Sequence, residues 1–433
     1  MTKLDGLVDL ELGTVNASIY TDEELYQLEL EKIFGKCWLF LAHESMIPKP
    51  GDYVTTYMGE DPVIVTRLPD GTVGAFLNVC RHRGMRLCRS DGGNARAFTC
   101  TYHGWTYNRS GSLVSVPHEE DGYLNNLDKS QWGLIPVTQV TNHRGFIFGT
   151  WDAEAEPFLD YLGDMAWYFD SFVNRWERSE VIGEAIRWTI GCNWKYPSEQ
   201  FASDLYHAET SHISSLIAQL PEGYDGPADF NGALRGVQFS SPKGHGTGFF
   251  VEESEDLTVP GPAVEEYRRN RRPSEIERLG EFRATRVRGH NTVFPNFSFL
   301  VGTNIMRVWH PKGPNALECW TWTLVDADAP DEIKDDWRRN ALRTFSAAGL
   351  FEAEDGENWT EIQGTLRGWR TRKNMLNMSM GIGSATGENE FGIPGTLSNI
   401  YGEEAARRFY GRWLELLQDD GHAPSPNGAG EER

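Results

Sequence analysis

The first regular spacing of hydrophobic residues lies near the N-terminus. Apolar side chains recur at roughly helical intervals between positions 25 and 33, which places them on one face of a helix. Thr21 and Glu24 have the spacing of a capping box, with Thr21 as the N-cap, and Gly35 is typical of a helix end. We therefore predict a helix over about 22–34, with its apolar face in the core.

From Cys37 to about Trp151 the pattern changes to short β-branched runs separated by turn sequences. Pro-Asp-Gly at 69–71 and Asn-Arg-Ser-Gly at 108–111 are typical of hairpin turns. The pattern predicts a small antiparallel β domain. Its predicted strands are 63–67, 73–79, 96–100, 105–107, 112–116 and 146–149.

The rest of the chain mixes helical and strand patterns. Helical spacing follows a linker at 154–157 and runs from 159 to 172, and a further helix is predicted to open at Pro330. A sheet covered by helices is an α+β domain. Three strands are predicted at 297–300, 305–309 and 317–324, and Pro- and Gly-rich sequence predicts a loop at 221–229 and a frayed tail at 423–433.

These patterns divide the chain into three parts. We predict an N-terminal helical segment over 1–37, which belongs to the catalytic domain, and a β domain over 38–156 inserted after it. The α+β catalytic domain, with an antiparallel sheet covered by helices, is predicted over 157–433.

Charge excludes some classes of partner. The chain has 433 residues with 63 acidic against 41 basic side chains, a formal net charge of −22. Phosphate attraction needs a basic face, so we expect no nucleic-acid partner and no anionic membrane partner. There is no run of about 18 apolar residues, so no membrane span is predicted. The N-terminal residues lack the apolar core of a signal peptide, which predicts a cytoplasmic protein.

Cysteine and histidine stand together twice between positions 80 and 103. Cys80 and His82 have Cys-x-His spacing, whereas Cys100 and His103 have Cys-x-x-His spacing. Two thiolates and two imidazoles can hold one tetrahedral zinc ion. They can also hold a [2Fe–2S] cluster with the thiolates on one iron and the imidazoles on the other.

The order of the ligands favours the cluster. Zinc fingers tend to pair Cys with Cys and His with His along the chain, beside a short helix. Here each pair mixes one Cys with one His, the order that lets each loop reach both irons of a Rieske cluster. The other four cysteines are then expected to be free thiols, namely Cys37, Cys88, Cys192 and Cys319.

A second group of metal-ligand side chains lies in the stretch from Gln200 to His212. Asp204 and His207 are three positions apart, which predicts that they share a helical face. His207 and His212 are five apart, so the helix must carry a π-type bulge or break before His212. Two histidines near a carboxylate suggest the facial triad of non-haem Fe(II) oxygenases. A Rieske cluster in the same chain supports this interpretation, because a one-electron donor needs an acceptor such as a second iron site.

The third ligand must come from another part of the chain. The segment from Leu350 to Trp359 holds four carboxylates, and its apolar residues indicate that some of them are buried. A buried carboxylate needs a partner, such as a metal ion. The residues alone do not choose among the four, which are Glu352, Glu354, Asp355 and Glu357.

Three stretches together resemble the α subunit of Rieske ring-hydroxylating dioxygenases, the naphthalene, biphenyl and arylpropionate dioxygenase group. They are the Cys/His pairs, Asp-x-x-His-x-x-x-x-His at 204–212, and Phe-Glu-x-x-Asp-Gly-Glu-Asn-Trp at 351–359. The segment 38–52 also resembles these enzymes, and the resemblance spans nearly the whole chain. It implies that Asp355 is the third iron ligand. It also implies that Asp204 links an iron histidine to a Rieske histidine across a subunit boundary.

The resemblance implies a reaction and a set of partners. Electrons would pass from NADH through a reductase and a ferredoxin to the [2Fe–2S] cluster, and then to a mononuclear Fe(II). Both atoms of O2 would be added to an aromatic ring to give a cis-dihydrodiol. A small β subunit would complete an α3β3 hexamer.

The resemblance also implies an apolar substrate pocket. It would be lined by Phe201, Leu205, Ala208, Phe345 and Phe351, with Gln200 near the iron, where some relatives have Asn. Nothing in the sequence marks an arginine that would bind a substrate carboxylate in this pocket.

Three alternatives remain open at this point. A Rieske monooxygenase or O-demethylase would use the same metals but give a phenol rather than a diol. A structural protein stabilised by zinc would contain no iron. An electron carrier would need no second metal site and far fewer residues.

Overall fold

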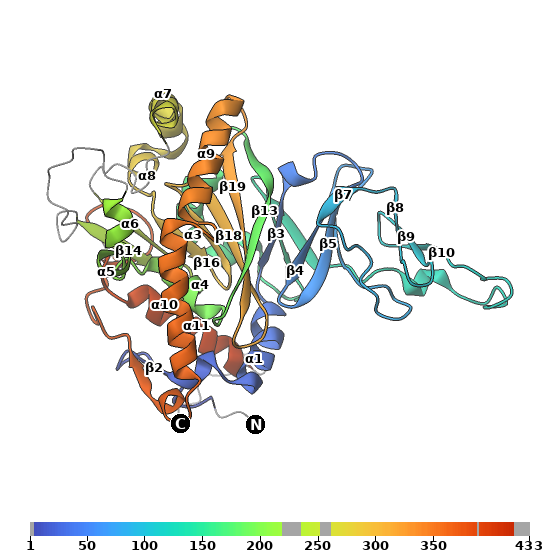
Figure 1. Cartoon of the computed structure of the whole chain (residues 1–433), viewed down its shortest axis with the longest axis horizontal. Coiled ribbons are helices and arrows are strands. Elements are labelled where there is room, and N and C mark those ends of the chain that lie inside the picture. Colours follow the sequence, from blue (N-terminus) through green and yellow to red (C-terminus); the bar gives the residue numbers. More distant parts are fainter. Residues whose placement is uncertain (1–3, 219–234, 252–260, 388, 420–433) are drawn as a thin grey trace, which may run out of the picture.

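The chain forms a large body with a smaller β projection at one end (Figure 1). The structure is a computed structural model, in which the predicted α+β class is confirmed. The predicted loop at 221–229 and the tail at 423–433 lie outside the residues that the structure describes. These residues are 4–218, 235–251, 261–387 and 389–419.

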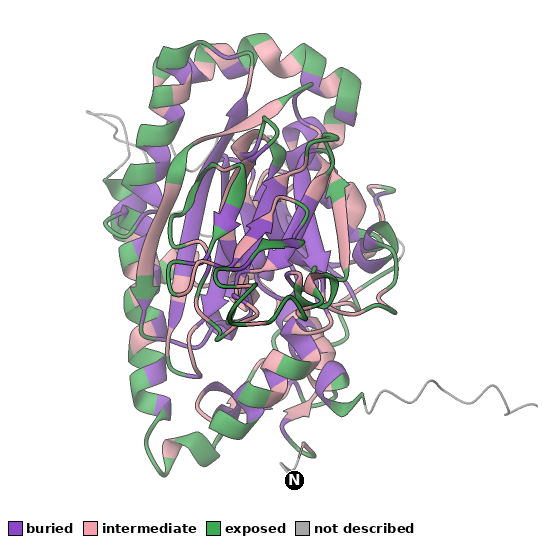
Figure 2. Cartoon of the chain, turned by 90° about the vertical axis from the view of Figure 1, so that its right-hand side faces the viewer, coloured by how far each residue is buried: buried purple, intermediate pink, exposed green. Residues whose placement is uncertain are grey.

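An eight-stranded antiparallel sheet forms the centre of the large body. The strand order is β13-β19-β18-β17-β16-β15-β14-β21. The three strands predicted between positions 297 and 324 are confirmed as β17, β18 and β19, with ends within two residues of the prediction. Figure 2 shows these central strands as mostly buried. The bounds are β13 (Ser179–Ile190), β14 (Gly236–Ser240), β15 (Gly246–Phe250), β16 (His290–Val293), β17 (Phe297–Leu300), β18 (Ile305–Pro311), β19 (Leu317–Asp326) and β21 (Thr396–Asn399).

Helices cover the sheet and carry the second group of metal-ligand side chains. The helix predicted to open at Pro330 is confirmed, because Pro330 is the N-cap of α9. The single helical run predicted from 159 to 172 is instead two helices, because Gly163 adopts a positive φ of 52° between them. The bounds are α2 (Phe158–Leu162), α3 (Met165–Val173), α4 (Lys195–Ser203), α5 (Ala208–Ser211), α6 (Ile213–Ile217), α7 (Pro262–Leu279), α8 (Glu281–Thr285), α9 (Asp331–Thr344), α10 (Leu350–Leu366) and α11 (Glu404–Gln418).

The N-terminal segment packs onto the large body. The predicted helix is found as α1 (Glu23–Glu29), continued by a π-helical turn, η2 (Leu30–Phe34). The predicted N-cap, Thr21, is wrong. Asp22 is the N-cap, because its carboxylate accepts the Leu25 N–H at 3.0 Å. The remaining elements are β1 (Val8–Asp9), β2 (Thr14–Asn16), η1 (Ala17–Tyr20), η5 (Thr371–Lys373) and β20 (Met375–Asn377).

A buried ion pair ties α1 to the helix that leads into the metal-ligand stretch. Glu29 and Lys195 are fully buried, and Lys195 Nζ lies 2.5 Å from Glu29 Oε1. The Glu29 carboxylate also accepts hydrogen bonds from the indole N–H groups of Trp194, at 2.8 Å, and Trp413, at 2.7 Å. The start of α4 is therefore fixed against both α1 and α11.

The β projection consists of small antiparallel sheets, as predicted. The hairpins predicted around 69–71 and 108–111 are confirmed as β5–β6 and β9–β10. The sheets of this part of the chain are β6-β5-β4-β7, β10-β9-β8 and β11-β12-β3, and the last of these packs into the main core through β3 and β12. The bounds are β3 (Leu39–His43), η3 (Glu44–Met46), β4 (Asp52–Met58), β5 (Asp61–Arg67), β6 (Val73–Leu77), β7 (Gly92–Asn94), β8 (Ala97–Thr99), β9 (Thr106–Asn108), β10 (Leu113–Ser115), η4 (Lys129–Trp132), β11 (Gln139–His143) and β12 (Phe146–Thr150).

The projection has a hydrophobic cluster of its own and is joined to the large body by specific contacts. The cluster contains Cys80 and Cys100 and is separate from the main core. At the junction, Arg187 forms an ion pair of 2.7 Å with Asp91 and lies 3.6 Å from the ring centre of Trp320. The two parts are therefore in direct contact, with an Arg–Trp cation–π interaction beside an ion pair.

No helix among the described residues is both long and apolar enough to cross a membrane. None of the six cysteines forms a disulfide, as expected for Cys37, Cys88, Cys192 and Cys319.

Candidate metal centres and active site

The two Cys/His pairs lie on turns of nearly identical backbone structure. In each turn the cysteine N–H donates to the carbonyl five residues later, Met85 in one turn and Trp105 in the other, at 2.9 and 2.8 Å. Four residues after each cysteine comes a glycine with positive φ, 73° for Gly84 and 75° for Gly104. Such a conformation strains any residue with a Cβ atom, so the turns require glycine.

The side chains on these turns lie close together. The rings of His82 and His103 are 4.5 Å apart between centres, and His82 stacks on Trp105. The hydroxyl of Tyr107 lies 3.5 Å from Cys80 Sγ. Burial raises the pKa of Cys80, so its thiolate needs a cationic partner such as a metal ion.

This arrangement does not suit a single zinc ion. Ligands of one tetrahedral ion converge on a common centre, so their atoms lie within about 4 Å of one another. In the described residues, the group of three or more His, Cys, Asp or Glu side chains whose ligand atoms meet within 4.8 Å is His207, His212 and Asp355. The Cys/His turns form no such group, whereas a [2Fe–2S] cluster spreads its ligands over two irons.

The second site is built around a break in the chain after α4. Asp204 ends α4 with extended backbone, and His207 is the residue before α5, so these two side chains do not share a continuous helix as predicted. His212 joins α5 to α6. The spacing of His207 and His212 allowed either a π-type bulge or a break in the helix. The structure has the break, because His212 lies between α5 and α6. This break lets both imidazoles turn toward α10.

Three ligand atoms meet at this break. The Nε2 atoms of His207 and His212 are 3.1 Å apart, and Asp355 Oδ1 lies 3.4 Å from the first and 3.2 Å from the second. Three ligands about 2.1 Å from one metal ion and at right angles to one another would be about 3 Å apart. The residues thus fit an ion held on one face, with the opposite face open.

The structure distinguishes among the four carboxylates of α10. Asp355 faces both imidazoles and is 1% exposed, whereas Glu357 is exposed. Glu352 is paired with Arg307. Glu354 lies on the other side of His212, with Oε2 2.8 Å from Nδ1. The sequence holds no local signal for this contact, because the contact depends on how two helices meet.

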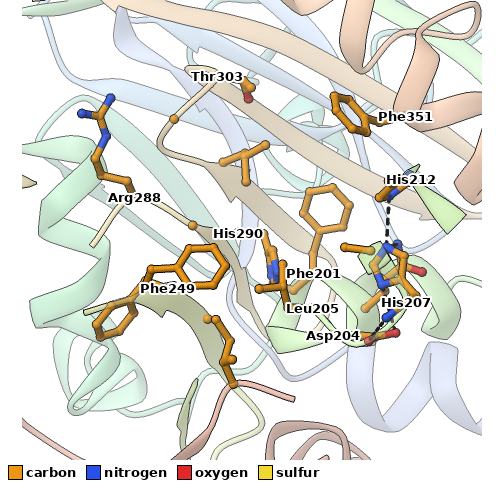
Figure 3. Close-up of a pocket in the computed structure, with 18 of the residues that line it drawn as sticks. Phe201, Asp204, Leu205, His207, His212, Phe249, Arg288, His290, Thr303 and Phe351 are labelled. Atoms are coloured by element: carbon orange, nitrogen blue, oxygen red, sulfur yellow. Dashed lines mark hydrogen bonds and ion pairs between the residues drawn. The ribbon is translucent and has the colours of Figure 1, made fainter. Parts of the chain in front are cut away.

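A carboxylate oxygen lies beside Nδ1 of each histidine of the triad. Asp204 Oδ2 lies 3.3 Å from Nδ1 of His207 (Figure 3), and Glu354 occupies the same place beside His212. A carboxylate at Nδ1 keeps the proton there and leaves the Nε2 lone pair for a metal. Gln200 donates from its amide nitrogen to Asp355 Oδ1 at 2.9 Å, and its oxygen accepts the Trp359 indole N–H at 2.7 Å.

The carboxylates make the site attractive to a cation. Burial alone would lower the pKa of His207, but Asp204 and Asp355 raise that pKa to about 10. Burial would raise the pKa of Asp355, but the two histidines hold that pKa well below its usual range. A divalent metal ion would take the place of the proton that the site otherwise binds.

A pocket with a cavity volume of about 140 Å³ extends from the triad. Figure 3 shows His207 and His212 at one side of this pocket and Arg288 far from them. All six residues that the sequence suggested for the pocket line it, together with Asp204 and the triad. The six are Gln200, Phe201, Leu205, Ala208, Phe345 and Phe351.

The part of the pocket that comes from the sheet has no signal in the sequence, which marks none of its residues. The sequence marked no arginine for the pocket, yet Arg286 and Arg288 are among the lining residues. Arg286 donates from Nε to the Val251 carbonyl at 3.0 Å, which ties its side chain to the backbone. These positions belong to strand ends and loops without a local motif, so only the sheet register reveals them. The missed residues are Gly248, Phe249, Phe250, Arg286, Arg288, Gly289, His290, Leu300, Gly302, Thr303 and Ile400.

Comparison with known families gives two matches. Residues 37–134 match the Rieske [2Fe–2S] domain, and residues 160–419 match the ring-hydroxylating α subunit catalytic domain.

Similar proteins cover nearly the same length. The benzene 1,2-dioxygenase α subunit of Pseudomonas putida is 48% identical, over 96% of this chain and 94% of that protein. The biphenyl 2,3-dioxygenase α subunit of Rhodococcus jostii strain RHA1 is 47% identical, over 95% of this chain and 90% of that protein. A crystal structure of a naphthalene 1,2-dioxygenase mutant bound to phenanthrene superposes with a TM-score of 0.89, at 35% identity, over 96% of this chain and 95% of that one.

These relatives favour dioxygenation over the monooxygenase alternative. They are large subunits of multicomponent enzymes, which implies a partner subunit and electron-transfer proteins for this chain as well. The chain therefore belongs to the α subunits of aromatic-ring-hydroxylating dioxygenases, oxidoreductases that carry a Rieske [2Fe–2S] cluster and a mononuclear iron.

Proposed function

We propose that this chain is the terminal oxygenase subunit for a one- or two-ring aromatic hydrocarbon, which it converts to a cis-dihydrodiol. The observation that carries the proposal is the triad of His207, His212 and Asp355 at one side of a largely apolar pocket. The relatives named for benzene and biphenyl support this substrate class. Apolar walls bind a hydrocarbon ring and exclude water from the reacting atoms.

We assign the metal ligands as follows. Cys80 and Cys100 hold one iron of the cluster and His82 and His103 hold the other, and the triad holds the mononuclear Fe(II). The Fe(II), when bound, supplies one-electron chemistry and open coordination positions for dioxygen. We also propose that residues 1–37 are an N-terminal segment of the catalytic domain, that 38–156 are the Rieske domain and that 157–433 are the rest of the catalytic domain.

The protein's own residues then have three tasks. Asp204 and Glu354 hold the Nδ1 protons of the two histidines, and Gln200 holds the carboxylate of Asp355 by a hydrogen bond. Phe201, Leu205, Ala208, Phe345 and Phe351 orient the ring.

We also propose that electrons cross between two copies of the chain. Figure 1 shows β8, β9 and β10 at one end of the long axis and α5 and α6 at the other, so one chain holds its two sites far apart. Asp204 keeps 35% of its side chain exposed beside His207, where a neighbour's Rieske histidine could reach it. A head-to-tail ring of three chains would bring each cluster to the next chain's triad.

The proposed assembly is an α3β3 hexamer with a small β subunit. It would receive electrons from NADH through a reductase and a ferredoxin. We expect it in the cytoplasm, the compartment that supplies NADH and keeps thiols such as these reduced.

Metal analysis and product identification test the proposed reaction. We expect iron and sulfide without stoichiometric zinc, and a Rieske EPR signal. Incubation with benzene, biphenyl or naphthalene and the electron-transfer proteins should give a cis-dihydrodiol with both oxygen atoms from O2. A phenol as the first product, with one atom from O2, would contradict the proposal.

The link between chains is tested by mixing variants. Asp355→Ala lacks the iron site and His103→Ala lacks the cluster, so each alone should be inactive. In a mixed ring an intact cluster can face an intact triad, and part of the activity should return. Mixed rings verified by mass spectrometry without any activity would show that electrons stay within one chain.

Asp204→Asn tests the bridge itself. The variant keeps the shape of the side chain but loses its charge. Loaded with saturating Fe(II), it should contain both metals and keep the oligomer, yet transfer electrons to the iron much more slowly. Cluster oxidation at the wild-type rate in a single turnover would exclude this role of Asp204.

A further inference from the structure

An arginine lies behind the aromatic wall of the pocket. Arg307 is on β18 and is 0% exposed, and Glu352, its partner in the first turn of α10, is 2% exposed. Neither residue lines the pocket. The pair therefore acts on a substrate only through the residues that it contacts.

The guanidinium of Arg307 joins three parts of the catalytic domain. Nη1 donates to Glu352 Oε2 at 2.7 Å, and Nη2 donates to the carbonyl of Phe345 at 2.7 Å. Nε donates to the hydroxyl of Thr321 on β19 at 3.1 Å. A planar guanidinium with all three nitrogens engaged has one orientation, so it fixes the α9–α10 connection relative to the sheet.

The same guanidinium supports two pocket-lining rings. Its Cζ atom lies 5.2 Å from the ring centre of Phe201 and 5.2 Å from that of Phe345. Phe345 also stacks on Phe351, whose ring packs edge-on against His212. The pair thus lies behind the part of the wall that is nearest to the triad.

Glu352 also connects the pair to the metal site. It stands one helical turn before Asp355 on α10, so the two side chains leave the same face of the helix. A shift of Glu352 would move the pocket wall and the Asp355 carboxylate together.

Stability alone does not explain why two charges are buried here. Replacing a buried ion pair by apolar residues of similar size is often neutral or stabilising, because desolvation offsets much of the attraction. A buried pair can instead select one arrangement of the elements that it joins.

We propose that Arg307 and Glu352 are positioning residues that determine which bond of the aromatic ring faces the iron. They do so by holding Phe345 against Phe201 in the part of the pocket wall next to Asp355. This inference rests on the proposed function, because it concerns the position of oxygen addition at that site.

The test replaces the pair without leaving a buried charge. The double variant Arg307→Met/Glu352→Leu should fold and keep its iron and cluster. The isomer ratio of the diols from biphenyl, whose ring carbons are inequivalent, should change at least threefold. Arg307→Lys keeps the charge but cannot reach all three acceptors, and should shift the ratio in the same direction by less.

A second buried pair provides the matched control. Arg175 and Glu275 are also 2.7 Å apart, at 5% and 7% exposure, and do not line the pocket. The variant Arg175→Met/Glu275→Leu should leave the isomer ratio unchanged, which separates positioning from general destabilisation.

Two results would overturn the inference. The first is a wild-type isomer ratio in both Arg307→Lys and the Arg307/Glu352 double variant. The second is a shift of the isomer ratio in Arg175→Met/Glu275→Leu that is as large as the shift in the Arg307/Glu352 double variant. Failure of the wild-type enzyme to form any diol would count against the proposed reaction instead.

Discussion

The two metal-binding regions of this chain are built in opposite ways. In the β projection, each Cys/His pair comes from one tight turn, and the four proposed ligands lie within a span of 24 residues, from 80 to 103. In the catalytic domain, His207 and Asp355 lie 148 positions apart and meet only because a broken helix packs against α10. A site made by local turns can be recognised from spacing, whereas a site made by packing depends on the whole domain.

The two regions also differ in the surroundings of their ligands. His82 and His103 are only partly buried. Asp355 is 1% exposed and is held by both histidines and by Gln200. An exposed cluster can exchange electrons with another protein, while a buried iron can exclude water from its reaction.

The largest expected effect comes from Asp355→Ala, which should remove the mononuclear iron and leave the cluster. Loss of a ligand that both histidines face should lower turnover by about a thousandfold or more. Iron analysis with EPR would show an intact Rieske signal. The neighbouring exposed carboxylate gives the control, since Glu357→Ala should retain both metals; activity in Asp355→Ala would reassign the ligand.

Glu354→Gln should weaken the iron site without removing a ligand. The change takes away the charge beside Nδ1 of His212, and loss of such a contact typically reduces metal affinity about 10- to 100-fold. Titration with Fe(II) under anaerobic conditions would measure this. Equal affinity in wild type and variant would mean that Glu354 does not support His212, and Glu357→Gln serves as the comparison.

Acid should destabilise the buried core of the catalytic domain. His245 is fully buried; it accepts the Phe294 N–H at Nδ1 and donates from Nε2 to the Tyr161 carbonyl. Burial lowers the pKa of His245 to about 3. Because the unfolded chain takes up the proton near pH 6.5, the stability that neutral His245 contributes is present above that pH and is lost as the pH falls.

The expected loss from His245 between pH 7 and pH 5 is about 2 kcal/mol. Chemical denaturation at several pH values would measure it. His245→Gln should be less stable at neutral pH but have a shallower pH dependence; an unchanged slope would show that the pKa of His245 does not differ between the folded and the unfolded protein.

Tyr107→Phe should have the smallest effect, confined to the cluster. The Tyr107 hydroxyl accepts the Arg81 N–H at 3.0 Å, which leaves its own proton directed toward Cys80 Sγ. Hydrogen bonds to cluster sulfurs raise the reduction potential, so the variant should have a potential lower by tens of mV. Redox titration followed by EPR would detect the change, with Tyr53→Phe as the control; a potential equal to that of wild type would exclude the hydrogen bond.

Sequence alone determined the features that depend on short-range physics. The Cys/His turns, the hairpins at 69–71 and 108–111, and the antiparallel strands at 297–324 followed from spacing and turn residues, because a few neighbouring residues fix such geometry. The segment 350–359 was marked only by its four carboxylates and neighbouring apolar residues, and only the family resemblance chose Asp355 among the four.

Tertiary structure decided what depends on contacts between distant segments. The break after Asp204, the place of Glu354 beside His212 and the support of Phe345 by Arg307 arise where α4, α10 and β18 meet. No local propensity encodes these contacts. They result from packing helices onto a sheet whose register places each buried charge next to its partner, so the substrate pocket is a property of the folded domain as a whole.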